Sequence, residues 1–305
     1  MKDPLSQIRL HSLMSISSGS PDISIGLIDG PVDFSHAAFH GSKIRTVKDS
    51  QLSECKNAGS IACAHGTFTA GILCAKRGLS APAICPSCEI ILNPIFRQDP
   101  DNGNGNTNNK KISKDVMNLP SATPGELSNV IIETIDAGAK IINLSLGLSA
   151  PSLTFYSNLQ EAYDYALQRG VIIIVAAGNQ GNIGNISLMN HEWLIPVAAC
   201  DVNGKLDPMS NFGPSIGKRG LMAPGVNIRS AYPGGEYTHM SGTSFSAPFV
   251  TGAVALLWSI FAKATAATII SSVIRAASNQ SRRASIIPPL LNAEEAFRLL
   301  RNTTA

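Results

Sequence analysis

The chain has 305 residues, of which 44% are hydrophobic and 15% are charged, and its formal net charge is +3. This composition is typical of a globular protein with a well-filled core and excludes a disordered chain. The basic residues form no stripe interleaved with aromatic residues, so we expect no nucleic-acid partner.

The chain lacks the apolar segments that membrane insertion and secretion require. Its longest apolar runs, at 171–177 and 250–258, are shorter than the roughly 18 to 20 residues that cross a bilayer, so we expect no membrane partner. The first 20 residues carry charged side chains and no continuous apolar core of a secretory signal. We therefore expect a cytoplasmic protein, and the sequence makes no prediction of its oligomeric state.

In chain order, short apolar runs rich in β-branched residues alternate with longer helical patterns. The sequence predicts a strand at 23–28, a helix at 65–76, a strand at 89–96, a helix at 126–137, a strand at 140–146, a helix at 159–169, strands at 171–176 and 193–199, and helices at 244–261, 264–277 and 293–300. Such alternation is typical of α/β proteins. Because most of these strands are apolar throughout, we expect a three-layer sandwich in which helices cover both faces of a mainly parallel sheet.

No repeat or linker divides the chain, which predicts a single domain over residues 1–305 with an N-terminal extension at 1–20. Residues 97–125 form a polar insertion rich in Asp, Asn and Gly. A calcium loop of the EF-hand type starting at Asp99 would need Gly at its sixth position and Glu at its twelfth, where Asn104 and Lys110 stand. We therefore expect a surface loop in this insertion, not a metal site.

The six cysteines are too few for a disulfide scaffold in a chain of this length. Cys85 and Cys88 form a CxxC pair, but a structural zinc site would need a second pair at similar spacing, which the chain lacks. The cysteines are expected to be mostly buried thiols, and a disulfide among Cys55, Cys63, Cys85 and Cys88, with its connectivity open, is favoured over a zinc site. No metal or other cofactor is expected.

Four polar residues stand where predicted strands end or predicted helices begin. Asp29 and Asn179 follow buried strands, and His65 and Ser244 open apolar helices. Active sites of parallel sheets collect at the carboxyl ends of the strands, and backbone N–H groups at a helix start can stabilise negative charge. Each residue alone has a commoner structural use, such as a helix cap for Ser244 or a turn for Asp29, so the prediction depends on their coincidence.

The motifs around these residues resemble those of the subtilisin-like serine proteases, the subtilases. Asp29 stands in Asp-Gly-Pro-Val-Asp-Phe-Ser-His, His65 in His-Gly-Thr, Asn179 in Ala-Ala-Gly-Asn, and Ser244 in Ser-Gly-Thr-Ser. The resemblance covers residues 23–261. It implies a serine endopeptidase in which Ser244 is the nucleophile, His65 the general base, Asp29 the residue that orients the base and Asn179 a donor to the oxyanion.

The same resemblance implies where a peptide or protein substrate binds. Two segments would line the primary specificity pocket and pair with the substrate as strands: Ser145, Leu146 and Gly147 on one side, and Ala176, Ala177 and Gly178 on the other. Residues 71–82 are fewer than the calcium loop usual in the family, so calcium dependence is not expected.

Three segments resemble the proteases that mature cyanobactins: Asp-Gly-Pro-Val-Asp at 29–33, Asn-Pro-Ile-Phe at 93–96 and Ser-Gly-Thr-Ser-Phe at 241–245. One type in that group removes a leader from a ribosomal precursor peptide, and another macrocyclises the product. The macrocyclases carry a helical cap between Asp and His, for which the interval from Asp29 to His65 has no room. This favours a leader-cleaving protease. A general intracellular subtilisin-like protease, a transpeptidase or macrocyclase, and a catalytically silent peptide-binding protein remain alternatives.

Overall fold

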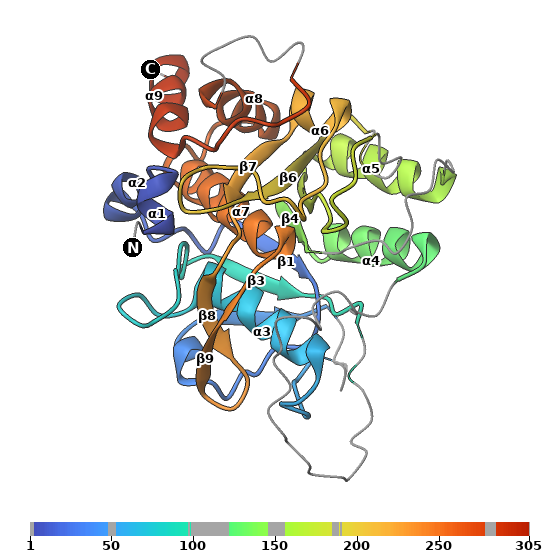
Figure 1. Ribbon diagram of the computed structural model, residues 1–305, viewed down its shortest axis with the longest axis vertical. Helices are drawn as coiled ribbons and strands as arrows, with labels where there is room; N and C mark the ends of the chain where they lie inside the picture. Colours follow the sequence, from blue (N-terminus) through green and yellow to red (C-terminus); the bar gives the residue numbers. More distant parts are fainter. Residues whose placement is uncertain are drawn as a thin grey trace.

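The centre of the molecule is a seven-stranded parallel sheet with the strand order β2-β3-β1-β4-β5-β6-β7 (Figure 1). The computed structural model describes residues 3–47, 53–96, 98, 122–145, 156–184, 189, 191–277 and 285–304. The strands of the sheet are β1 (Ser24–Ile28), β2 (Lys43–Thr46), β3 (Glu89–Leu92), β4 (Ile141–Leu144), β5 (Ile172–Ala176), β6 (Leu194–Cys200) and β7 (Leu221–Pro224). A separate antiparallel hairpin consists of β8 (Ile228–Tyr232) and β9 (Glu236–Met240).

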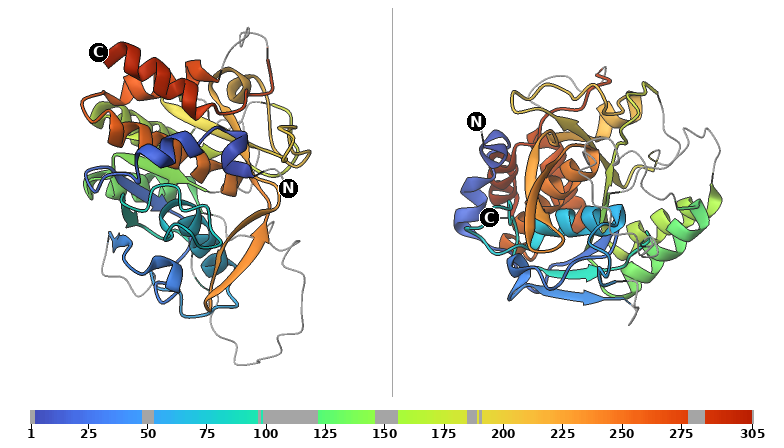
Figure 2. Two further views of the ribbon diagram at one scale, coloured as in Figure 1. Left: turned by 90° about the vertical axis from the view of Figure 1, so that its left-hand side faces the viewer. Right: turned by 60° about the horizontal axis from the view of Figure 1, so that its bottom comes forward.

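Helices cover both faces of this sheet, which confirms the expected three-layer α/β sandwich (Figure 2). α4 (Pro124–Asp136) and α5 (Ser157–Arg169) pack on one face, and α3 (Ile61–Cys74) and α7 (Thr243–Ile260) pack on the other. The remaining helices are α1 (Pro4–Gln7), α2 (His11–Ile16), α6 (Pro214–Arg219), α8 (Ala266–Ala276), α9 (Ala293–Thr304) and the 3₁₀ helix η1 (Ala37–Phe39).

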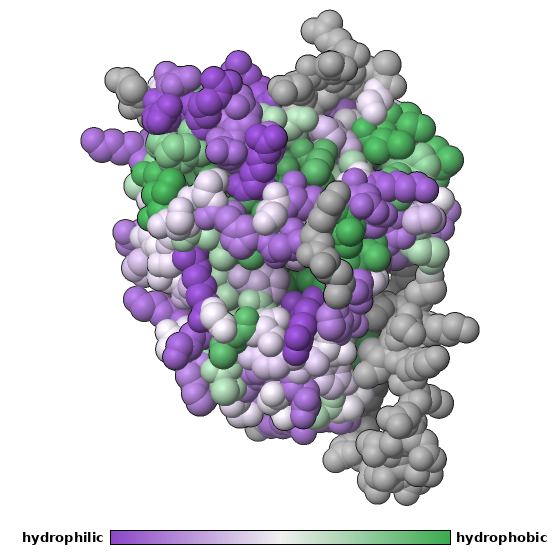
Figure 3. Space-filling model, turned by 60° about the vertical axis from the view of Figure 1, so that its left-hand side comes forward, coloured by the Kyte–Doolittle hydropathy of each residue, from purple (hydrophilic) through white to green (hydrophobic). Residues whose placement is uncertain are grey.

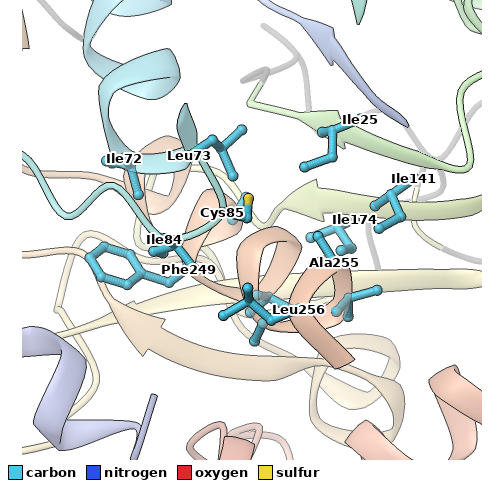
Figure 4. Close-up of a cluster of buried hydrophobic side chains, with 14 of the residues drawn as sticks. Ile25, Ile72, Leu73, Ile84, Cys85, Ile141, Ile174, Phe249, Ala255 and Leu256 are labelled. Carbon is cyan, nitrogen blue, oxygen red and sulfur yellow. The ribbon is translucent and has the colours of Figure 1, made fainter. Parts of the chain in front are cut away.

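The strands at the centre of the sheet send alternate side chains into two separate apolar clusters. Ile25, Ile141 and Ile174 face α3 and α7, where they meet Leu73, Phe249 and Leu256 (Figure 4). Their neighbours Ile142 and Ile173 face α4 and α5. Because successive residues of a strand point to opposite faces, an unbroken isoleucine run needs a cover on both sides. Each fully buried side chain of this size stabilises the fold by about 1.5 to 3 kcal/mol.

Helix α7 lies in the larger cluster and is apolar nearly all round. Among the described residues it is the one helix that is long and apolar enough to cross a membrane, judged by length and composition alone. However, 89% of the helix is buried inside the fold, where it packs against β4, β5, β6 and β7. A helix in the core of a protein meets the same criterion of length and composition, and the extent of its burial identifies α7 as a core helix.

The N-terminal residues form part of the core. Leu5, Ile8, Leu10 and Leu13 are buried, and Ala293 N–H at the start of α9 donates to Ile8 O at 3.0 Å. Helix α2 therefore lies against α7 and α9 (Figure 1). Although residues 1–20 precede the first strand of the sheet, those from Leu5 onward pack like the rest of the domain.

Several expected boundaries differ from the structure. Helix α3 begins at Ile61, one turn before His65, because Ala64 N–H already donates to Ser60 O. Helix α4 begins at Pro124 after a capping box formed by Thr123 and Glu126, so the polar insertion ends at 123. Apart from Gln98 and positions 122 and 123, that insertion lies outside the described residues.

Candidate active site

Asp29 and His65, separated by 36 positions in the chain, meet in the interior of the protein. Asp29 follows directly on β1, is fully buried, and its Oδ1 lies 2.5 Å from His65 Nδ1. The same oxygen accepts a hydrogen bond of 2.6 Å from Gly30 N–H. With the N–H on Nδ1 donated to a carboxylate, the imidazole presents its other nitrogen, Nε2, as a base. His65 Nε2 is buried and has no hydrogen-bond partner among the described residues.

Two glycines allow the strand end and the helix to approach this closely. A Cβ atom on Gly30 would lie 2.0 Å from Ala62 O, and one on Gly66 would lie 2.3 Å from Gly30 O. Real Cβ atoms do not come this near to a backbone oxygen, so α3 lies directly on the main chain that follows Asp29. This contact sets the separation of the carboxylate and the imidazole.

Ser244 is the second residue of α7 and is 2% exposed. The His65 ring packs against the ring of Phe245 at a centroid distance of 5.1 Å, which brings the imidazole to the end of α7 that carries the serine. In the first turn of a helix the backbone N–H groups have no acceptor within the helix, and the helix dipole is positive there. The serine hydroxyl therefore lies in a setting that favours developing negative charge.

Ser145 supports the backbone of Ser244. In a regular helix the N–H of residue 248 would donate to Ser244 O, but Pro248 has no N–H. Ser145 Oγ replaces that donor with a hydrogen bond of 2.9 Å to Ser244 O. Asn143 in β4 donates to Ser145 Oγ at 2.7 Å and accepts from Thr251 Oγ1 at 2.8 Å. All three polar side chains and the carbonyl lie in the interior, so this network fixes the start of α7 on the sheet.

Asn179 lies just beyond β5, and two hydrogen bonds set the orientation of its amide. Its Oδ1 accepts from Thr243 N–H at 2.8 Å and from Thr243 Oγ1 at 3.0 Å. The donor end of the amide consequently faces elsewhere, and a Cβ atom on Gly242 would lie 3.2 Å from Asn179 Nδ2. The amide N–H₂ group therefore lies beside Gly242, the residue that caps α7 two positions before Ser244.

The expected substrate-binding segments begin at adjacent strand ends. Ser145 follows β4, while Ala176, Ala177 and Gly178 end or follow β5, and these two strands pair with each other. Leu146 and Gly147 lie outside the described residues. The side chain of Ser145 contacts Ser244 O, which the sequence motif did not suggest.

A disulfide joins Cys55 to Cys63, two positions before His65. It settles the connectivity that the sequence left open, since Cys85 and Cys88 are free and buried. Gln98 is joined to the segment that follows Cys55, because its Oε1 accepts hydrogen bonds from the N–H groups of Lys56 and Asn57. Among the residues that the structure describes, no group of three or more His, Cys, Asp or Glu side chains is arranged to hold a metal ion.

Comparison with known proteins identifies the family. A model of the subtilase family matches residues 20–289. The chain belongs to the subtilase family. This subtilase is 31% identical over 248 residues to a thermophilic serine proteinase of Bacillus sp. (strain AK1), a match that covers 79% of the chain and 53% of that relative. It thus spans about half the length of this curated relative.

Solved structures resemble the subtilase over nearly its whole length. A mutant of the protease domain of PatA has a TM-score of 0.80 and 28% identity, covering 93% of this chain and 97% of that one. The prenylagaramide maturation protease PagA has a TM-score of 0.78 and 26% identity, covering 95% and 98%. These similarities confirm the resemblance to subtilases and agree with the resemblance to proteases of peptide maturation.

Sequence reasoning missed several residues that hold the site of this subtilase in place. Thr243 orients Asn179, Phe245 packs on His65, and Asn143 connects β4 to α7. A signal for Asn143 was present, because a lone amide in the apolar run Ile141–Leu144 has to find a buried partner. Thr243 and Phe245 gave no such signal, since their partners lie far away in the sequence.

Proposed function

We propose that this subtilase is a serine endopeptidase that works through Asp29, His65 and Ser244. The observation that carries the proposal is the buried hydrogen bond from His65 Nδ1 to Asp29 Oδ1, which leaves Nε2 unpaired beside the start of α7. In this arrangement the imidazole takes the proton of the Ser244 hydroxyl as its oxygen attacks the scissile carbonyl. Asp29 holds the ring in the required tautomer and stabilises the imidazolium that forms.

The negative charge on the carbonyl oxygen would be received by two donors. One is Asn179 Nδ2, whose orientation follows from the bonds that Thr243 makes to its Oδ1. The other is the Ser244 N–H in the first turn of α7. The proton on Nε2 then passes to the leaving amine, and a water molecule hydrolyses the acyl-enzyme by the same steps in reverse.

Ser244→Ala tests the nucleophile. The parent protein should react with a fluorophosphonate probe at Ser244 and cleave peptides, while Ser244→Ala should do neither at an unchanged melting temperature. Equal peptide cleavage by the two proteins would disprove the assignment.

Asn179→Leu tests the oxyanion donor. This change should lower kcat by about 10² to 10³, the range known from removing such a donor from a subtilisin, with little change in KM. The side chain is similar in size but also removes the acceptor of Thr243 N–H, so the melting temperature of the variant serves as a check on the fold. A loss confined to KM would instead assign Asn179 to substrate binding.

We infer that the substrate is a ribosomally made precursor peptide from which a leader is removed. This inference is supported by similarity over 93% and 95% of the chain to the protease domain of PatA and to PagA, which is named a maturation protease. The short interval of 36 positions between Asp29 and His65 favours hydrolysis over macrocyclisation. A peptide library digested in the presence of a competing amine and analysed by mass spectrometry should give linear products that carry an added water. Amine adducts or cyclic products would favour a transpeptidase.

A further inference from the structure

The segment that carries Asn179 has little regular secondary structure to hold it. It runs from Ala177 to Gly184 between β5 and the residues that precede β6, and Gly178 and Gly181 adopt left-handed backbone conformations with φ of +97° and +64°. Residues 209–212 run alongside it. Gly181 N–H donates to Met209 O at 2.8 Å, and Asn211 N–H donates to Gly178 O at 2.9 Å.

The side chain of Asn211 fills the bend of this segment. It is 3% exposed, and its Oδ1 accepts from Gln180 N–H at 3.2 Å and from Asn182 N–H at 2.9 Å. Its Nδ2 donates to Ala177 O at 3.0 Å and to Gln180 Oε1 at 2.7 Å. The amide of Asn211 thus forms hydrogen bonds with backbone groups on both sides of Asn179. In a strand or a helix, these groups would be paired with other backbone groups.

The fit between Asn211 and the bend is close. A Cβ atom on Gly178 would lie 2.4 Å from Asn211 Nδ2, so the main chain touches the amide directly. Removing the amide would leave the buried Ala177 O and the N–H groups of Gln180 and Asn182 without these partners, and the bend would shift to find new ones. Asn179 lies at the centre of that bend.

We propose that Asn211 is a positioning residue that holds the oxyanion donor Asn179 in place. The inference rests on the proposed function and extends it. Asn211 acts through the backbone around Asn179 and makes no contact with substrate. An oxyanion donor is effective because it is fixed before the reaction, and a displacement of about 1 Å can cost about 10²-fold in rate.

Asn211→Ala and Asn211→Asp test the proposal, with Ser210→Ala as the matched control. Asn211→Asp retains an acceptor for the N–H groups of Gln180 and Asn182 but places a second oxygen against Ala177 O. Ser210 is the neighbouring buried side chain, and it accepts from Ala199 N–H and donates to Asn211 O, so its loss should destabilise the fold without altering the bend. Both Asn211 variants should lower kcat by about 10- to 100-fold with KM within about threefold, and Ser210→Ala should leave kcat unchanged.

A double-mutant cycle separates positioning from general destabilisation. In a background that already carries Asn179→Leu, Asn211→Ala should lower kcat by no more than about twofold, because the group that it positions is gone. The proposal would be overturned if Asn211→Ala lowered kcat as much in this background as in the parent, or if Ser210→Ala lowered kcat equally. Should Asn211→Ala fail to fold, Asn211→Asp serves in the same cycle.

Amide hydrogen exchange gives a readout independent of activity. Exchange at Gln180 and Asn182 should rise by about tenfold or more in the Asn211 variants and not in Ser210→Ala. If the parent shows no activity that depends on Ser244, the proposed function fails, and the exchange rates still decide whether Asn211 holds the bend. If the parent is active and Asn211→Ala matches it in both kcat and exchange, only the present inference fails.

Discussion

Pro248 removes one backbone donor from the beginning of α7, and Ser145 replaces it. The replacement comes from the residue that follows β4, and β4 pairs with β1, the strand that Asp29 follows. As a result, the carbonyl of the proposed nucleophile is tied to the sheet, whereas in an unbroken helix it would bond within its own turn. The position of Ser244 therefore depends on the packing of α7 against β4.

Ser145→Ala should show this dependence. It leaves the buried Ser244 carbonyl without a donor, which costs about 1 to 3 kcal/mol of stability. The expected result is a lower melting temperature together with a fall of about tenfold in kcat, because the start of α7 shifts. Ser272→Ala is the control, since Ser272 Oγ also donates to a backbone carbonyl, Thr268 O, at 2.9 Å but lies in α8. If both variants lose stability and neither loses kcat, Ser145 does not position the serine.

The sequence allowed the four proposed catalytic residues to be located because each lies next to a long apolar run whose end can be recognised. Asp29 follows β1 and Ser244 opens α7. The supporting contacts could not be predicted in this way. The bond from Thr251 to Asn143 joins residues 108 positions apart, and it exists only because α7 crosses β4 at that point. The spacing of apolar residues along the sequence does not show where a helix crosses a strand.

The hairpin of β8 and β9 is attached to the loop after β1 by polar contacts. Asp33 Oδ2 accepts from Gly234 N–H at 2.8 Å, and His36 Nε2 lies 2.8 Å from Glu236 O. Burial raises the pKa of the Asp33 carboxyl, but hydrogen bonds from Ser35 and Gly234 outweigh it and hold the pKa below its ordinary value. The ionised carboxylate therefore stabilises the attachment.

Asp33→Asn should alter the response of stability to acid. Because the pKa of Asp33 is lower in the folded than in the unfolded protein, its contribution is present above the unfolded value of about 4 and is lost as the pH falls through the folded value. The parent should melt at a higher temperature than Asp33→Asn at pH 7, and thermal melts in progressively stronger acid should show the difference shrinking. A constant difference at every pH would mean that the charge on Asp33 is not involved.

The elements that sequence analysis missed differ in kind from those that it found. Strand β2 alternates exposed and half-buried residues and carries Lys43 and Arg45, as suits the edge of a sheet. Strand β7, at the other edge, ends at Pro224. The hairpin did leave a signal in the Pro-Gly-Gly sequence of its three-residue loop, since Gly234 and Gly235 both have a φ of +82°, a left-handed conformation that favours glycine. The buried strands at the centre of the sheet were predictable because they are rich in β-branched apolar residues, whereas β7 is buried too but has none.

Taken as a folded whole, the protein places its apolar residues in two clusters separated by the sheet, and the face shown in Figure 3 mixes polar with apolar residues. The free cysteines, Cys74, Cys85, Cys88 and Cys200, all belong to the buried clusters. Burial raises the pKa of the Cys74 and Cys200 thiols to about 12, so they are protonated and unreactive at neutral pH.

Thiol titration should reveal this arrangement. The native protein should react slowly with a disulfide reagent, the denatured protein should show the four free thiols, and prior reduction should add the two from the disulfide. Replacing Cys55 and Cys63 together by serine should leave four thiols with or without reduction. Two thiols in the denatured, unreduced parent would instead indicate a second disulfide.

The main-chain contact between Gly30 and Gly66 also limits how the protein can change. The contact is between main-chain atoms, so neither glycine has a side chain that a smaller residue could replace to make room for the other. A genetic screen for suppressors of Gly66→Ala should therefore return reversion at codon 66, and no compensating smaller residue at position 30.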